Sequence, residues 1–196
     1  MSAYQLLRPL AFASVKGPTL NAYRWGAPIA LSVLGGGAYL LLPKGIDLVG
    51  DKSASDFMAS FFVTLPGFFI AALAAVVAFN GGDLDKEMPG VTVPIRANGD
   101  DAPVELTLRM FLCYLFSYLT VLSFIGFFAS VVGALLTPSL NHWIAAVPGV
   151  PHQHELHSLL GTLFIVGLTF LSASVVLCTA LGLYFLAERV HQNLIS

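Results

Sequence analysis

Four long runs of apolar residues divide the chain, and none of them contains Asp, Glu, Lys or Arg. They cover roughly Trp25–Leu42, Phe57–Phe79, Met110–Leu136 and His157–Ala187. Each run is close to or longer than the about 20 helical residues that cross a bilayer. The runs are continuous rather than alternating, which excludes a closed barrel. Since backbone polar groups in lipid must be satisfied within the segment, the pattern predicts four transmembrane helices.

The longest polar stretch, 79–109, connects the second and third runs and holds nine of the twenty Lys, Arg, Asp and Glu residues. Its opening Asn-Gly-Gly-Asp is typical of the end of a helix. Two segments, 91–96 and 104–109, then alternate apolar and polar residues on either side of Asn98-Gly99, which predicts a β-hairpin. Pro94 and Pro103 favour edge or frayed pairing. An isolated hairpin is marginal in water, so it needs a surface to pack against.

The predicted fold is an all-α integral membrane protein with four transmembrane helices and a small cytoplasmic β-hairpin insert between helices 2 and 3. Residues 1–24 form a cytoplasmic or interfacial N-terminal segment, broken by Pro9. A loosely ordered lead-in is the alternative for this segment. Residues 25–196 form the four-helix membrane domain, which includes the cytoplasmic loop 80–109.

Composition agrees with a membrane protein. The chain is 57% hydrophobic and 10% charged, with a mean hydropathy of +0.82, whereas soluble domains carry about 25% charged residues. The net charge of −2 and the lack of a basic tract argue against direct nucleic-acid binding. The two cysteines, Cys113 and Cys178, fall in apolar runs and are expected to be free thiols.

The distribution of Lys and Arg predicts the orientation. With the N-terminus inside, the cytoplasmic set is Arg8, Lys16, Arg24, Lys86, Arg96, Arg109 and Arg189, and the external set is Lys44 and Lys52. Both termini and loop 80–109 are therefore expected in the cytoplasm, in a multi-pass protein of the inner (plasma) membrane. The first apolar run is expected to stay as a span, because no small-residue cleavage site follows it.

The spans carry small residues at packing spacing and no charge. Charge-free spans argue against ion-coupled transport and intramembrane catalysis. Small residues let helices approach closely, within one chain or between copies of a homo-oligomer. The rows expected to hold an oligomer are Gly67, Ala71 and Ala75 on the second span and Gly167, Ala173 and Ala180 on the fourth; Ser123, Gly126, Ser130 and Gly133 line the third. Kinks are expected at Pro66 and at Gly35–Gly37.

The metal-like cluster of the sequence is Pro-His-Gln-His-Glu-Leu-His, with His152, His154, Glu155 and His157. It lacks the spacing of a metalloprotease motif. His154 and His157 would share a face at the start of a helix, which leaves a weak zinc or pH-sensing site and a polar external cap as alternatives. We find no phosphate loop, nucleophile elbow or Cys-x-x-Cys pair, so no enzyme activity, cofactor or metal site is predicted.

The layout resembles the membrane subunits of the Kiwa anti-phage defence system, the KwaA family. The resemblance covers the whole chain: four charge-free spans, both ends inside, and the insert Gly-Val-Thr-Val-Pro-Ile-Arg-Ala-Asn-Gly-Asp-Asp-Ala-Pro-Val-Glu-Leu-Thr between the second and third spans. It implies a homo-oligomeric inner-membrane protein that responds to phage attack at the envelope. It also implies a cytoplasmic DNA-binding partner subunit (KwaB) and no catalytic residues.

The leading hypothesis is an oligomeric sensor and scaffold that couples envelope or membrane disturbance to a partner docked on the hairpin loop. The expected partner-binding residues are Asp83, Asp85, Lys86, Glu87, Arg96, Asp100 and Asp101. A solvated connector that only joins two spans is the plainer interpretation of the loop. The alternatives for the whole protein are a holin-like, pore-forming effector and, against the charge-free spans, a small transporter.

Overall fold

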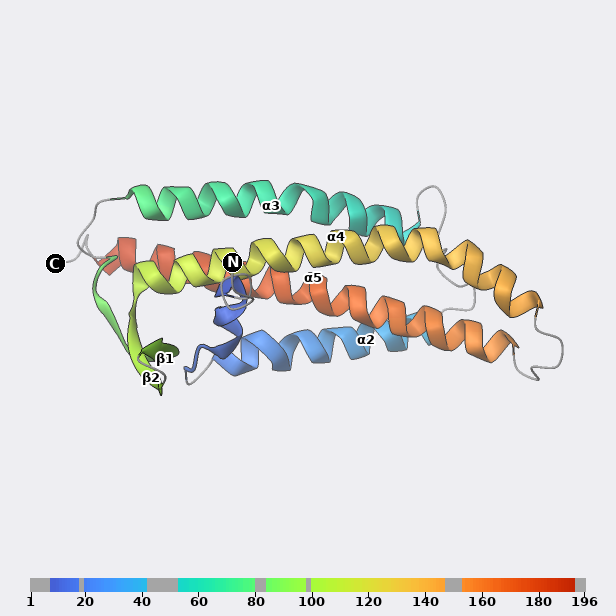
Figure 1. Cartoon of the computed structure of the whole chain (residues 1–196), viewed down its shortest axis with the longest axis horizontal. Coiled ribbons are helices and arrows are strands. Elements are labelled where there is room, and N and C mark those ends of the chain that lie inside the picture. The colour runs from blue at the N-terminus through green and yellow to red at the C-terminus, as the bar shows by residue number, and fades with distance from the viewer. Residues whose placement is uncertain are drawn as a thin grey trace.

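The computed structural model describes residues 8–17, 20–41, 53–79, 84–97, 100–146 and 153–192. Long helices lie side by side along most of its length (Figure 1). They are α2 (Ala27–Leu41), α3 (Ala54–Ala78), α4 (Leu108–Ala146) and α5 (Gln153–Gln192). Strands β1 (Glu87–Ala97) and β2 (Asp100–Thr107), the short 3-10 helix η1 (Arg8–Ser14) and the π-helical turn η2 (Ala22–Gly26) complete the described elements.

Three of the helices are long and apolar enough to cross a membrane. These stretches are Ala54–Ala78, Leu108–Thr137 and Leu159–Ala187, each with a mean hydropathy of 2.3. The structure thus confirms a mostly helical chain compatible with a multi-pass membrane protein. Helix α2 is described over 15 residues, fewer than the about 20 that a span needs, and residues 42–52 lie outside the described part. The described part of the chain therefore holds three candidate spans, and the prediction of four spans is not confirmed.

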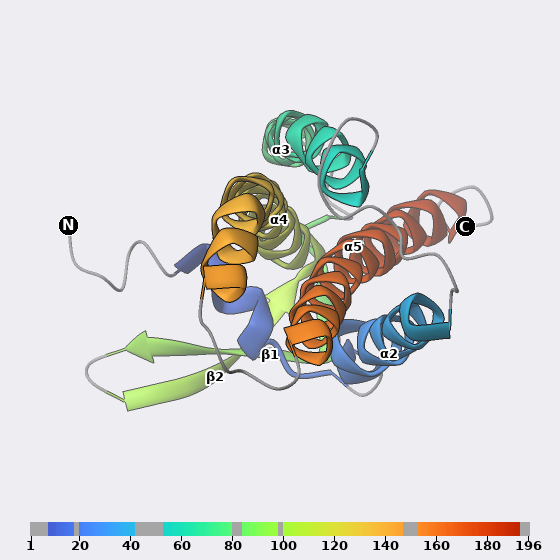
Figure 2. The ribbon, with the colours of Figure 1, turned by 90° about the vertical axis from the view of Figure 1, so that its right-hand side faces the viewer.

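The helices form a curved row in the order α3, α4, α5 and α2 (Figure 2). Helix α3 packs on α4, α4 packs on α5, and α2 packs on the opposite side of α5. Less than a third of the most apolar window of each candidate span is buried inside the chain. Much of the helical surface therefore faces outward and is apolar, as expected for lipid or for further copies of the chain.

Glycines set the close approaches within this row. A Cβ at Gly126 on α4 would lie 2.6 Å from ring carbons of Phe62 on α3, and a Cβ at Gly133 would collide with the ring of Phe164 on α5. Ser123 and Ser130 on the same face are fully buried. The small-residue row of the third span therefore packs helices within one chain.

The expected kinks do not interrupt the helices. Helix α3 is continuous through Pro66, and α2 is continuous through Gly35–Gly37. Gly36 instead lies against α5, where a Cβ would be 2.5 Å from Val166. Gly35 and Gly36 thus serve close packing on α5, whereas a Cβ at Gly37 would meet nothing within 4 Å.

The N-terminal segment 8–17 is part of the protein core. Phe12 is 1% exposed and packs on two side chains of α4, with ring centroids 5.7 Å from Phe111 and 5.4 Å from Tyr118. Val15 is fully buried. The described part of the segment is thus anchored on α4 by apolar contacts, which the sequence did not indicate.

Candidate functional site at the hairpin end

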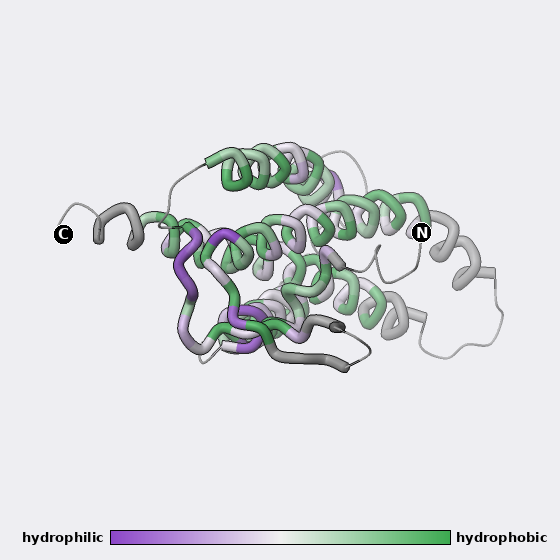
Figure 3. Tube along the Cα trace, turned by 60° about the vertical axis from the view of Figure 1, so that its left-hand side comes forward, coloured by the Kyte–Doolittle hydropathy of each residue, from purple (hydrophilic) through white to green (hydrophobic). Residues whose placement is uncertain are grey.

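The polar elements gather at one end of the helix row. The end of α3, the start of α4, both strands and the N-terminal segment meet there, and the last turns of α5 lie nearby (Figure 1). Polar backbone segments stand out at this end against the apolar helices (Figure 3). The predicted polar connection is therefore part of an assembled structure that includes the N-terminal segment.

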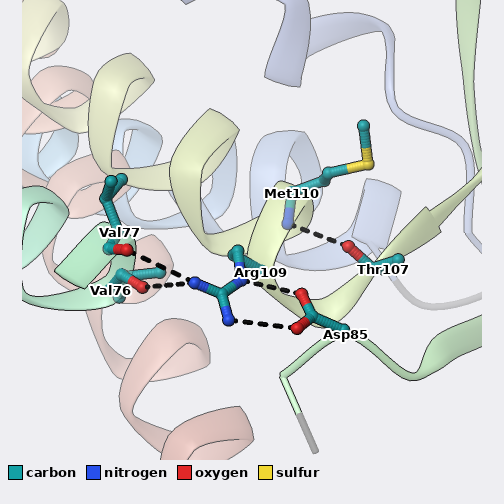
Figure 4. Close-up of polar contacts among 6 residues, drawn as sticks. All are labelled: Val76, Val77, Asp85, Thr107, Arg109 and Met110. Carbon is teal, nitrogen blue, oxygen red and sulfur yellow. Dashed lines mark hydrogen bonds and ion pairs between the residues drawn. The ribbon is translucent and has the colours of Figure 1, made fainter. Parts of the chain in front are cut away.

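Arg109, the second residue of α4, holds three parts of this end together (Figure 4). Its Nε and Nη2 donate to the two carboxylate oxygens of Asp85 at 2.8 and 3.1 Å. Its Nη1 donates to the carbonyls of Val76 and Val77 at 3.4 and 3.3 Å. These carbonyls end α3, where a cation also favours the helix dipole. The guanidinium thus joins α4 to the end of α3 and to the connector, residues 84–86, which lead into β1.

Backbone hydrogen bonds fix the same connector. The amide of Arg109 donates to the carbonyl of Leu84 at 2.8 Å, and the amide of Leu108 donates to the carbonyl of Lys86 at 3.2 Å. The amide of Met110 donates to Oγ1 of Thr107 at 3.3 Å, which caps the first turn of α4. The first amides of an α-helix have no partner within the helix. In α4 the connector and Thr107 supply the acceptors for three of them.

Strands β1 and β2 pair antiparallel, with Ala97 opposite Asp100. The hairpin that the sequence predicted around Asn98-Gly99 is therefore present, although these two residues lie outside the described part of the chain. The register shifts between Glu87 and Thr92. Gly90 lies in this bulge with φ 81°, a conformation that favours glycine.

The hairpin packs on its own chain. Its buried side chains are Met88, Val91, Val93 and Leu106, and they join the cluster that contains Phe12 and Val15. Lys16 adds one antiparallel bridge to β1: its amide donates to the carbonyl of Thr92 at 2.9 Å, and the Thr92 amide donates back at 3.1 Å. The packing surface that the hairpin needs is thus supplied by the N-terminal segment and the start of α4.

The prolines lie on the outer edges of this hairpin. Thr92 directs its N–H and C=O to Lys16 and away from β2, so Thr92 and Glu105 form a non-hydrogen-bonded pair. Paired positions alternate, so Pro94 and Pro103, two positions further, form another such pair. Both proline nitrogens therefore face outward, and an incoming strand would find no donor there. The hairpin edges are poor templates for strand addition.

The strands point away from the helix row and run across its long axis (Figure 2). In a membrane-spanning arrangement, the hairpin would therefore lie along the plane of the membrane. Glu105 is exposed on β2, and Glu87 is exposed at the start of β1. The acidic side chains of the described part of the hairpin are presented on a fixed backbone.

The predicted partner-binding residues fall into three groups. Asp85 is 59% exposed but already pairs with Arg109. Lys86 and Glu87 are exposed. Arg96, Asp100 and Asp101 lie on the distal strands, where Arg96 is opposite Asp101 in the register, but their side chains lie outside the described part. Asp83 lies outside it entirely.

Arg24 is a residue whose role the sequence did not reveal. It was expected among the cytoplasmic cations, yet it is 8% exposed. Its Nη1 donates to the carbonyls of Phe12 and Val15 at 2.9 and 3.0 Å, and its Nη2 donates to Oδ1 of Asn21 at 2.8 Å. Arg24 therefore ties the N-terminal segment to the start of α2. An Arg next to a Trp at the start of an apolar run carries no sequence signal for such a role.

The predicted oligomer rows lie mostly on the outer surface. Gly67, Ala71 and Ala75 are exposed on α3, and Gly167 and Ala180 are exposed on α5, whereas Ala173 is 9% exposed and packs within the chain. A Cβ at Gly67 or at Gly167 would meet nothing within 4 Å. Both rows except Ala173 are thus free to contact another molecule.

The histidine cluster is placed only in part. His154 and His157 lie in the first turns of α5, but their side chains, and all of His152, are outside the described residues. Among described side chains, no group of three His, Cys, Asp or Glu could hold a metal ion.

Comparison with known proteins identifies no relative: no family model, no curated protein and no solved structure matches the chain.

Proposed function

We propose that this chain is a four-span inner-membrane protein, with α2 as the remaining span, that acts as an oligomeric sensor and scaffold for a soluble partner. Its hairpin end and both termini face the cytoplasm, as the Lys and Arg distribution favours. Its copies associate through exposed small residues outside the groove of α5, which are Gly67, Ala71 and Ala75 on α3 and Ala180 on α5. The membrane part responds to envelope or membrane disturbance, and the hairpin end carries the partner.

The observation that carries this proposal is the construction of the hairpin end. A connector that only joins two spans needs a handful of residues and no fixed structure. Here Arg109 binds the connector, Phe12 and Val15 support the strands, and Lys16 adds a bridge. Such support is expected of a surface that another protein contacts. Since Pro94 and Pro103 interrupt the strand edges, the partner would bind through side chains.

The chemistry of the surface favours a basic partner. Asp85 pairs with Arg109, whereas Glu87 and Glu105 are exposed. The sequence adds three more acidic residues to this loop, Asp83, Asp100 and Asp101. Complementary charge on two proteins increases their rate of association and fixes their relative orientation more than it increases affinity. The resemblance to the Kiwa membrane subunit makes the partner a DNA-binding protein and the trigger phage attack, and DNA-binding proteins commonly carry basic surfaces.

The holin-like pore has less support in the described part of the chain. A pore needs a polar lining, but the hydroxyls of Ser123 and Ser130 are buried and donate to the carbonyls of Leu119 and Gly126 in their own helix. Tyr118 is 7% exposed and packs on Phe12. These groups are committed to packing within the subunit.

Native co-purification tests the proposal. The full chain is isolated from its host membrane in mild detergent, and the protein that accompanies it is identified by mass. The test variant combines Glu87→Gln, Asp100→Asn, Asp101→Asn and Glu105→Gln. The control is Asp56→Asn, which removes one exposed carboxylate at the opposite end of α3.

We expect the combined variant to reach the membrane in normal amount and to lose the partner, while the control retains it. Each exposed pair contributes no more than about 1 kcal/mol, so single changes should do little. Retention of the same partner in the same amount by the combined variant would refute docking at this end.

A further inference from the structure

An apolar groove follows α5 on its outward side. It has a volume of about 340 Å³ and is lined by Ala129 of α4 and by Leu163, Phe164, Gly167, Leu168, Phe170 and Leu171 of α5. All of these residues lie within the stretches that are apolar enough to cross a membrane. The volume falls at the low end of the about 300–1,000 Å³ typical of small-ligand sites, so the groove suits one extended chain of methylene groups.

The groove leads toward buried polar groups on the hairpin side. Trp25 stacks on Phe170 with ring centroids 5.9 Å apart. One turn further along α5, Ser174 is 1% exposed, and its hydroxyl has no hydrogen-bond partner among the described residues. Trp25 lies in η2, which packs on α5, and the residue before it is Arg24. This packing places the guanidinium of Arg24 close to the same end of the groove.

That guanidinium retains an unused donor. Nη1 and one hydrogen of Nη2 are bound, whereas the buried Nε has no acceptor among the described residues. Arg109 shows what this edge of the group binds, because its Nε and Nη2 hold both oxygens of a carboxylate. No described carboxylate pairs with Arg24. A buried cation without an anion is costly, so this position favours an anionic ligand.

The depth of Arg24 fits a lipid headgroup. The span Leu108–Thr137 has 30 residues, about 45 Å of helix against a hydrocarbon core of about 30 Å. Arg24 donates to the carbonyl of Phe12, whose ring packs on Tyr118, and Tyr118 lies about 15 Å along α4 from Leu108. With the excess helix on the hairpin side, the guanidinium lies where hydrocarbon meets headgroups.

We propose that Arg24 and the groove form a binding site for one anionic phospholipid of the leaflet on the hairpin side. The free edge of Arg24 and the hydroxyl of Ser174 donate to phosphate oxygens, and one acyl chain lies over Gly167. Basic pockets between membrane helices commonly bind lipid headgroups in this way. The site rests on the membrane placement proposed above and does not depend on partner docking.

Trp25 provides a reporter for the test. The chain has two tryptophans, so Trp143→Phe leaves Trp25 alone beside the groove. The purified full chain is placed in vesicles of brominated phosphatidylcholine, whose bromine atoms quench tryptophan fluorescence. Unbrominated phosphatidylglycerol then replaces the brominated lipid stepwise.

A site that prefers the anionic lipid binds phosphatidylglycerol before that lipid makes up much of the membrane. We expect the Trp25 fluorescence of the Trp143→Phe chain to recover at a low phosphatidylglycerol fraction. This fraction should be at least about tenfold lower than the one expected if phosphatidylglycerol only diluted the brominated lipid, because one charge-assisted hydrogen bond contributes about that factor. Arg24→Gln should recover only in proportion to dilution; its amide can still donate to the carbonyls of the N-terminal segment, so the fold is retained. Recovery in proportion to dilution in the Trp143→Phe chain itself would overturn the proposal.

Two glycine variants test the groove independently of Arg24. Gly167→Leu fills it and should reduce quenching and abolish the preference, whereas Gly37→Leu on α2, whose Cβ would also meet nothing within 4 Å, should change neither. Loss of the preference on addition of inorganic phosphate alone would indicate an anion site without a lipid. Quenching that appears only when the protein is diluted in lipid would show a second copy in the groove. Either result refutes the lipid occupant.

Discussion

Substitution of Gly126 by alanine tests whether α3 packs on α4 as closely as the structure shows. The new Cβ would lie 2.6 Å from Cε1 and Cζ of Phe62, whereas carbon atoms in contact are about 3.5–4.0 Å apart. The ring would therefore have to move by about 1 Å. Phe62 is fully buried and lies edge-on to Phe61 at 5.2 Å, so the ring has little room.

The magnitude follows from two opposing effects. Overpacking a core costs about 1–3 kcal/mol, while replacing a glycine inside a helix by alanine gains about 0.5–1 kcal/mol. The net loss for Gly126→Ala is about 0–2.5 kcal/mol, and the loss relative to a glycine-to-alanine change without a clash is the full cost of about 1–3 kcal/mol. Gly37→Ala is the matched control, because Gly37 lies within α2 and its Cβ would meet nothing within 4 Å. The control should show only the gain.

A thiol-reactive dye can follow thermal unfolding in mild detergent. Cys178 is 1% exposed and reacts only when the chain opens, and Cys113→Ser removes the second thiol. A domain of this size shifts its midpoint by about 2–4 °C per kcal/mol. We expect the Gly126→Ala midpoint to lie several degrees below that of Gly37→Ala. Equal midpoints would show that Phe62 does not lie against Gly126.

Three further outcomes test orientation, assembly and the connector. Cysteines at Asn98 and Gln153, in a background without native cysteines, should label from opposite sides of the membrane; labelling of both from outside intact cells would refute the orientation. Ala180→Leu should weaken self-association by roughly 1 kcal/mol, which native mass measures; a monomeric parent protein would contradict this. Ala173→Leu should instead destabilise the subunit by about 1–3 kcal/mol, which the thermal midpoint measures. Arg109→Gln should lower stability by about 1–2 kcal/mol, since its exposed ion pair contributes little and its helix-end contacts add a similar amount; an unchanged midpoint would contradict this.

The apolar runs predicted the long helices well. The expected second span, Phe57–Phe79, corresponds to α3 at Ala54–Ala78, and the expected third span lies within α4. The alternating segments around Asn98-Gly99 predicted the hairpin, but the second segment was expected to reach Arg109, whereas β2 ends at Thr107 and Leu108 begins α4. These features are encoded locally, by continuous hydrophobicity and by the turn preference of two residues.

The assembly of the hairpin end was not predictable from the sequence. Phe12 packs on Phe111, and Arg109 binds carbonyls of Val76 and Val77, contacts between positions far apart along the chain. No periodic pattern of apolar and polar residues along the sequence indicates which of these distant positions will meet. Asp85 and Arg109 were expected to contribute separately to an exposed charge pattern, whereas their mutual pairing depends on how α3 and α4 meet. The helix ends had to be placed in space before that pair could be found.

The two proposed sites share one structural element. Arg24 binds the carbonyls of Phe12 and Val15, and Lys16, the next residue, forms the bridge to Thr92 on the hairpin. A phosphate on the free edge of the same guanidinium would fix its position, and loss of that lipid would leave the cation held by two neutral carbonyls and one amide. A displacement of the Val15 carbonyl, to which Arg24 donates, would pass to β1 through Lys16 alone. Disturbance of the leaflet would then reach the partner surface without any charge crossing the apolar spans.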